Sequence, residues 1–140
     1  MPTKSGPTYQ QIMSDLKAGK FAPVYILMGE ESYYIDKIAD YIADNALRPE
    51  ERDFNQTVIY GADTTTMKIV DQAHQFPMMA ERQVIIVKEA QALRQLEPLE
   101  KYLKNPVKST ILVWCYKNGK IDARKKVIAL AQAAGVVFES

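Results

Sequence analysis

Along this chain, short apolar runs alternate with segments whose apolar residues recur at helical spacing. The runs are bounded by turn residues and read as continuous apolar stretches, which is typical of strands buried on both faces of a parallel sheet. The predicted strands are residues 23–29, 56–60, 83–87, 109–115 and 136–139. Helical spacing predicts helices at 9–16, 31–47, 67–73, about 94–104 and 123–134. This alternation predicts an α/β domain with three layers, in which a five-stranded, mostly parallel sheet is flanked by helices.

Residues at the ends of these segments supply the expected caps and stops. Ser32 and Asp122 are expected N-caps, because their side-chain oxygens can accept hydrogen bonds from free N–H groups at the start of a helix. Pro49 lies beyond the expected end of the helix at 31–47, and Gly135 ends the last helix. The apolar side of each helix is expected to face the sheet, with Ile35, Ile38 and Ile42 in the second helix, Met67, Val70 and Ala73 in the third, and Leu96, Leu99 and Leu103 in the fourth.

The composition is that of an ordinary globular domain. The chain has 140 residues, of which 47% are hydrophobic and 25% charged, enough for one domain with one core. A formal net charge of +1 gives no general affinity for polyanions, although local clusters remain possible. The single cysteine excludes an internal disulfide, and no apolar run is long enough for a membrane span or a signal peptide. These features predict a cytoplasmic protein.

The chain stops as a predicted strand, VVFE, begins near its end. We therefore expect residues 1–140 to form a single domain that is a fragment of a longer protein. The alternative is a natural chain that ends in an edge strand.

The loop after the first predicted strand lacks the residues that bind phosphate. A P-loop needs a second glycine followed by Lys and Ser/Thr, and none of these follows Gly29 at the required spacing. Glu30 and Glu31 instead place negative charge where a phosphate would bind. The third strand continues into Lys88, whereas an ATPase strand ends in an acidic residue that holds the metal. The sequence therefore predicts no ATP hydrolysis by this chain.

The segment before the third predicted strand is unusually apolar for a connection. Pro77 disfavours helix at Phe76, which leaves Met78 and Met79 on a short elbow. Such an elbow either packs into the core or is presented to a partner.

The remaining candidate chemistry is sparse. His74 is the only histidine, so it offers neither a metal site nor a catalytic triad, and Cys115 is expected to be a small core residue. Arg124, Lys125 and Lys126 lie near the predicted start of the last helix, where they can contact a phosphate backbone or form a solvated basic face.

Three segments resemble one family over essentially the whole chain. PVYILMGEESYYIDKI with its degenerate phosphate loop, FPMMAERQVIIVKEAQAL and STILVWCYK are similar to the N-terminal domain of the bacterial DNA polymerase III delta subunit, a clamp-loader protein. The resemblance implies an AAA+-like, P-loop-NTPase-like fold without a working nucleotide site, and no cofactor. It also implies that the family continues into a helical domain and a collar domain.

The resemblance gives the elbow a partner. In that family a loop before the third strand carries a hydrophobic pair, typically Leu-Phe, that enters a pocket on the sliding clamp and helps to open the ring. Met78 and Met79 stand at this pair, and Phe76 and Arg82 are further candidate contacts. The departure is that neither residue of the pair is aromatic. ATP hydrolysis is then expected in partner subunits of the loader, and DNA contact by this domain is expected to be weak or indirect.

Two other functions stay open at this point. One is a nucleotide-dependent enzyme with a divergent phosphate loop, and the other is a nucleic-acid module that uses residues 117–126.

Overall fold

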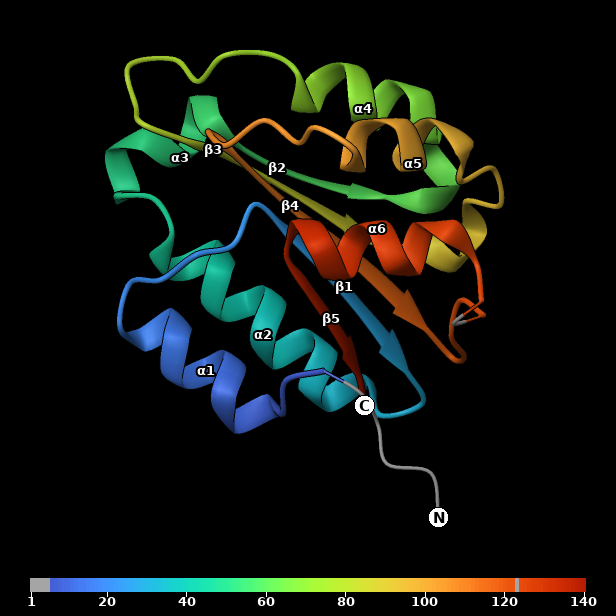
Figure 1. The fold of residues 1–140 in the computed structure, drawn as a ribbon. Helices are drawn as coiled ribbons and strands as arrows, with labels where there is room; N and C mark the ends of the chain where they lie inside the picture. Colours follow the sequence, from blue (N-terminus) through green and yellow to red (C-terminus); the bar gives the residue numbers. More distant parts are fainter. Residues whose placement is uncertain (1–5, 123) are drawn as a thin grey trace.

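A five-stranded parallel sheet with the order β2-β3-β4-β1-β5 organises the molecule (Figure 1). The structure is a computed structural model and describes residues 6–122 and 124–140. The strands are β1 (Val24–Gly29), β2 (Gln56–Tyr60), β3 (Gln83–Lys88), β4 (Thr110–Lys117) and β5 (Val136–Glu139). All five predicted strands are confirmed, and the sheet is wholly rather than mostly parallel. The strand order, which the sequence left open, places β4 at the centre between β3 and β1.

Helices cover both faces of this sheet, as predicted for a three-layer α/β domain. One face packs against α1 (Tyr9–Lys17) and α2 (Ser32–Asn45), and the other against α4 (Thr66–Ala73), α5 (Glu97–Leu103) and α6 (Lys126–Ala134) (Figure 1). Successive residues of β1 enter opposite cores: Ile26 packs with the α4–α6 layer, whereas Tyr25 and Leu27 pack with the α1–α2 layer. This burial on both faces explains the continuous apolar runs in the sequence.

The prediction of one helix over 31–47 is wrong at both ends. Ser32 is the first helical residue of α2 rather than its cap, and Glu31 takes the N-cap position without a side-chain hydrogen bond. Pro49 lies beyond the end of α2, as expected, but it also begins a further helix, α3 (Pro49–Asn55), that the sequence pattern does not predict. Proline suits the first position of a helix because the N–H that it lacks has no partner there.

Two other helices differ from the sequence prediction at their starts. Asp122 does not cap the last helix, because α6 begins at Lys126 with Lys125 as its N-cap. The helix expected at 94–104 is shorter: η2 (Ala90–Ala92) follows β3, and Leu96 is the N-cap of α5. Pro98, the second residue of α5, fits this later start, because proline is tolerated in the first turn of a helix.

The edge strand and α4 expose apolar residues that the sequence pattern assigns to the core. Val58 and Tyr60 of β2 are half exposed, because this strand lies at the edge of the sheet. Met67 is also exposed, and the buried side of α4 consists of Thr66, Ile69, Val70 and Ala73. None of the helices within the described ranges is long and apolar enough to cross a membrane.

The turn between α6 and β5 is packed so closely that only glycine fits. A Cβ atom on Gly135 would lie 2.2 Å from the carbonyl oxygen of Val24. We expect Gly135→Ala to lower the free energy of unfolding by about 1–3 kcal/mol, because the backbone of β1 or β5 must move. Ala133→Ser, at an exposed position of α6, is the control and should change the free energy of unfolding by less than about 0.5 kcal/mol. Equal urea-unfolding curves for the two variants would contradict this packing.

Candidate functional site

The loop between α4 and β3 (yellow-green in Figure 1) carries three large apolar side chains that are exposed to solvent. Phe76 is 87% exposed, Met78 61% and Met79 99%. Of the two possibilities that the sequence allows for this elbow, the structure therefore has the exposed one. Scattered apolar residues are common on protein surfaces, but three within four residues on one loop are typical of a surface that binds a partner.

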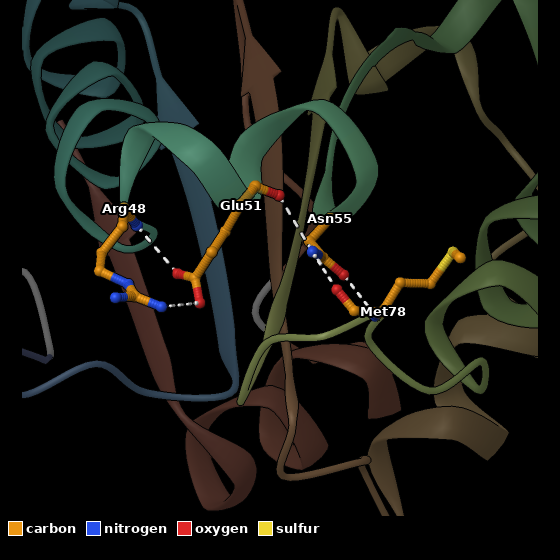
Figure 2. Close-up of polar contacts among 4 residues, drawn as sticks. All are labelled: Arg48, Glu51, Asn55 and Met78. Atoms are coloured by element: carbon orange, nitrogen blue, oxygen red, sulfur yellow. Dashed lines mark hydrogen bonds and ion pairs between the residues drawn. The ribbon is translucent and has the colours of Figure 1, made fainter.

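The side chain of Asn55 holds this loop from the neighbouring helix α3 (Figure 2). The Met78 N–H donates to Oδ1 of Asn55 at 2.6 Å, and Nδ2 of Asn55 donates to the Met78 carbonyl at 2.8 Å. Nδ2 also donates to the carbonyl of Glu51, one turn earlier in α3, at 3.0 Å. Asn55 is only 4% exposed, so these bonds form away from bulk water.

The start of α3 is fixed in the same way. The Arg48 N–H donates to a carboxylate oxygen of Glu51 at 3.0 Å, and the Arg48 guanidinium contacts the other oxygen at 3.3 Å (Figure 2). The hydrogen bond from the Arg48 backbone holds the pKa of Glu51 below its usual value. The helix that carries Asn55 is thus stabilised at its first turn by the Glu51 carboxylate, which accepts from both the backbone and the side chain of Arg48.

The backbone direction changes directly after Met78. Met79 has a φ of 55°, in the left-handed region that residues other than glycine rarely adopt. This conformation costs on the order of 1–2 kcal/mol. It occurs at the most exposed side chain of the elbow, so the local backbone is held in a specific shape rather than an extended one.

The base of the loop is anchored by two polar residues that begin neighbouring strands. Gln83 donates from Nε2 to the carbonyls of Gln75 and Gln72 at 2.6 and 3.1 Å. The Thr110 hydroxyl donates to the carbonyl of Ala73 at 2.7 Å. These carbonyls lie in or just after the last turn of α4, where few backbone N–H groups remain to bond to them, although the Gln72 carbonyl also accepts from the Gln75 N–H at 3.0 Å. Both ends of the elbow are therefore tied to the sheet or to α3.

A groove of 680 Å³ borders the elbow. Arg82 lines it and lies over the ring of Phe21, with 5.1 Å between the guanidinium carbon and the ring centroid. The other lining residues come from the α1–β1 loop, the end of α2, α3 and the elbow itself: Gly19, Asn45, Ala46, Leu47, Arg48, Glu51, Met79, Ala80 and Glu81. Arg82 is thus close to the apolar side chains, but its cation is already engaged with an aromatic ring.

The position of a phosphate loop, at the opposite edge of the sheet, is filled by contacts within the chain. The Gly29 N–H donates to the carbonyl of Gly119 at 2.8 Å, and the Glu31 N–H donates to the hydroxyl of Ser140 at 3.0 Å. Backbone N–H groups at this place hold phosphate in nucleotide-binding α/β domains. In this chain both donors are occupied, and the Glu31 side chain beside them is exposed.

The lysines that end β3 and β4 form ion pairs with α2. Lys117 lies 2.7 Å from Asp36, and Lys88 lies 3.8 Å from Asp40. No group of His, Cys, Asp or Glu side chains in residues 6–122 and 124–140 has the arrangement of a metal site.

The basic residues near α6 are not brought together as one unit. Arg124 forms bonds to Asp122, and its guanidinium holds the pKa of that carboxyl well below its usual value. Lys125 and Lys126 are exposed and line a separate groove of 430 Å³ with Arg94, Lys101 and Lys104, but also with Glu97 and Glu100. Phosphate-backbone contact by residues 124–126 stays a prediction.

The contacts of His74 and Cys115 are those of residues that pack within the domain. The His74 ring packs edge-on against Tyr102 with 5.1 Å between ring centroids, and its Nδ1 lies 3.0 Å from the Val70 carbonyl. Burial raises the pKa of the Cys115 thiol to about 12, which leaves it protonated and unreactive at neutral pH. The interpretation of Cys115 as a core residue is confirmed.

Asn55, Gln83 and Thr110 position the elbow but are not predicted from the sequence as part of a site. Asn55 lies in a helix that the sequence pattern does not predict. Gln83 and Thr110 begin buried strands, and their partners are distant in the sequence. A buried polar residue at the first position of an apolar strand is the one local signal that would have found them.

Comparisons with known proteins place the chain in a family. The family described as DNA polymerase III, delta subunit, matches residues 25–140. A curated relative, the DNA polymerase III subunit delta of Bacillus subtilis (strain 168), is 29% identical in an alignment of 139 positions that covers 92% of this chain and 40% of the relative. The chain therefore spans about two fifths of the length of this relative.

Solved structures agree with this assignment. The Bacillus subtilis DNA clamp loader delta protein has a TM-score of 0.83 at 26% identity, covering 95% of this chain and 42% of that chain. A gamma subunit-related protein of DNA polymerase III from Thermotoga maritima has a TM-score of 0.55 at 16% identity, covering 93% of this chain and 45% of that chain. At this identity the likeness concerns the fold only. By sequence and by structure, the chain belongs to the DNA polymerase III delta subunit family.

Proposed function

We propose that this domain binds the DNA polymerase sliding clamp through the elbow at residues 76–79 and helps to open the ring when the clamp is loaded. The observation that carries the proposal is the full exposure of Met79 beside Met78 on a loop whose backbone is anchored by Asn55. Membership of the delta subunit family and the likeness to a clamp loader delta protein support it.

Two physical properties make the elbow suitable for this role. Transfer of a methionine side chain from water to an apolar pocket is worth about 1.5–3 kcal/mol. The backbone that carries Met78 and Met79 is already ordered, so less conformational entropy is lost when they bind. To open the ring, the domain must bind the open clamp more tightly than the closed one, because only differential affinity shifts a conformational equilibrium.

The double variant Met78→Ala/Met79→Ala tests this proposal. We expect its Kd for the sliding clamp to rise more than about tenfold, because both anchors of the contact are lost. Its free energy of unfolding should change by less than about 0.5 kcal/mol, since both side chains are exposed. Calorimetric titration with the clamp and thermal unfolding measure the two quantities.

Met67→Ala is the matched control, because Met67 is an exposed methionine on α4 outside the elbow. Its clamp affinity should equal that of the unchanged protein. The variant Met78→Leu/Met79→Phe, which has the pair typical of the family, should retain binding. Unchanged affinity in the double alanine variant would refute the proposal, and loss of folding would show that the two methionines support the core instead.

We further propose that this domain does not hydrolyse ATP and needs no cofactor, and that hydrolysis takes place in partner subunits of the loader. The support is chemical: the donors of Gly29 and Glu31 bond within the chain, and Lys88 pairs with Asp40 where an ATPase has a metal-binding carboxylate. The alternative, a nucleotide-dependent enzyme, would need these contacts to break first.

Thermal unfolding in the presence of Mg-ATP tests this second statement. A ligand that binds the folded state raises the Tm, whereas we expect no change at millimolar Mg-ATP relative to magnesium alone. A Tm that increases with ATP concentration would establish a nucleotide site and contradict the proposal.

A further inference from the structure

We propose that Asn55 is a positioning residue for clamp binding: its side chain fixes the Met78 backbone and thereby aims the methionine pair at the partner. This inference rests on the proposed function of the elbow. Asn55 contributes no exposed surface of its own, so it would act through Met78 and Met79 rather than by touching the clamp.

The pattern of hydrogen bonds defines the orientation of the Asn55 carboxamide. Its three partners are the Met78 N–H, the Met78 carbonyl and the Glu51 carbonyl. One donor and two acceptors can be satisfied only with Oδ1 toward the Met78 N–H and Nδ2 toward the two carbonyls. The side chain thus imitates the edge of a paired strand, because it exchanges bonds with both polar groups of a single residue (Figure 2).

Contact with both polar groups of Met78 restricts the backbone on each side of this residue. The turn into the left-handed conformation of Met79 follows directly. Without the carboxamide, the elbow would lose its only described side-chain bonds between Gln75 and Gln83, and more extended conformations would compete. Freedom gained by the unbound loop must be lost again on binding, which lowers the affinity.

The place of Asn55 at the end of α3 fixes the geometry of these bonds. Asn55 is the last residue of a helix whose first turn is held by Arg48 and Glu51, so its Cα is fixed relative to the sheet. Alanine removes all three bonds. Aspartate keeps the shape and the acceptor for the Met78 N–H, but it cannot donate to either carbonyl when ionised.

The variant Asn55→Ala tests the inference by two measurements. Hydrogen exchange of the Met78 amide, followed by NMR without any partner, should become faster, because its acceptor is gone. The Kd for the sliding clamp should rise about tenfold, as expected when one or two residues must be ordered on binding. Both measurements are made well below the Tm of the variant.

Thr8→Ala is the control for a general loss of stability. Thr8 accepts a hydrogen bond from the Gln11 N–H at the start of α1, in a capping box that lies away from the elbow (Figure 1). This variant should lower the Tm but leave Met78 exchange and clamp affinity unchanged. An equal effect of Thr8→Ala and Asn55→Ala on clamp affinity would overturn the positioning role.

The remaining outcomes separate this inference from the proposed function. Clamp binding that is lost in Met78→Ala/Met79→Ala but normal in Asn55→Ala would reject the role of Asn55 alone. Clamp binding that survives in the double methionine variant would reject both. If Asn55→Ala does not fold, Asn55→Asp replaces it: the amide of Met78 should stay protected while clamp affinity falls, and unchanged affinity would again overturn the inference.

Discussion

The elbow at residues 76–79 keeps apolar side chains in water, and hydrogen bonds to its backbone are what hold it there. Collapse of Met78 and Met79 onto the domain surface would remove apolar area from water and would therefore be favoured if the loop were free to move. The Asn55 carboxamide opposes this on one side, and Gln83 and Thr110 fix the base on the other. The conformation of an exposed apolar loop of this kind depends on hydrogen bonds to its backbone, because its apolar side chains pack against little of the domain.

The parallel sheet separates this site from the place where a related fold would hold nucleotide. The elbow precedes β3 and so lies at the amino-terminal ends of the strands, whereas Gly29 ends β1 and Glu31 follows it at the carboxyl-terminal ends. At that second edge, Ser140 and Gly119 take the backbone donors. The elbow and the position of the phosphate loop are therefore held by separate sets of hydrogen bonds at opposite ends of the strands.

The sequence predicts the sheet and the lack of a P-loop, and it locates the apolar elbow without deciding between exposure and burial, because each of these depends on a local pattern. Apolar runs identify strands, and missing glycines exclude a P-loop wherever the chain folds. It does not predict α3, whose sequence PEERDFN has one large apolar residue, Phe54, which is exposed. A helix without an apolar face gives no periodic signal, and Pro49 is as consistent with the end of one helix as with the start of another. Asn55 was missed with it, since the bonds to Met78 join residues 23 positions apart.

The elbow combines an ordered backbone with flexible methionine side chains, and the order of the backbone offsets the entropy that these side chains lose when they are buried. Methionine is flexible enough to fill an irregular apolar pocket, but it loses rotamer freedom when buried, at a cost of up to about 2 kcal/mol per side chain. A Leu-Phe pair would lose less freedom but would have to match the shape of its pocket more closely. A chain with two methionines therefore depends more strongly on an ordered backbone, because side-chain and backbone ordering would otherwise both subtract from the same apolar gain. Under the proposed role, the three hydrogen bonds of Asn55 would supply this order before a partner binds.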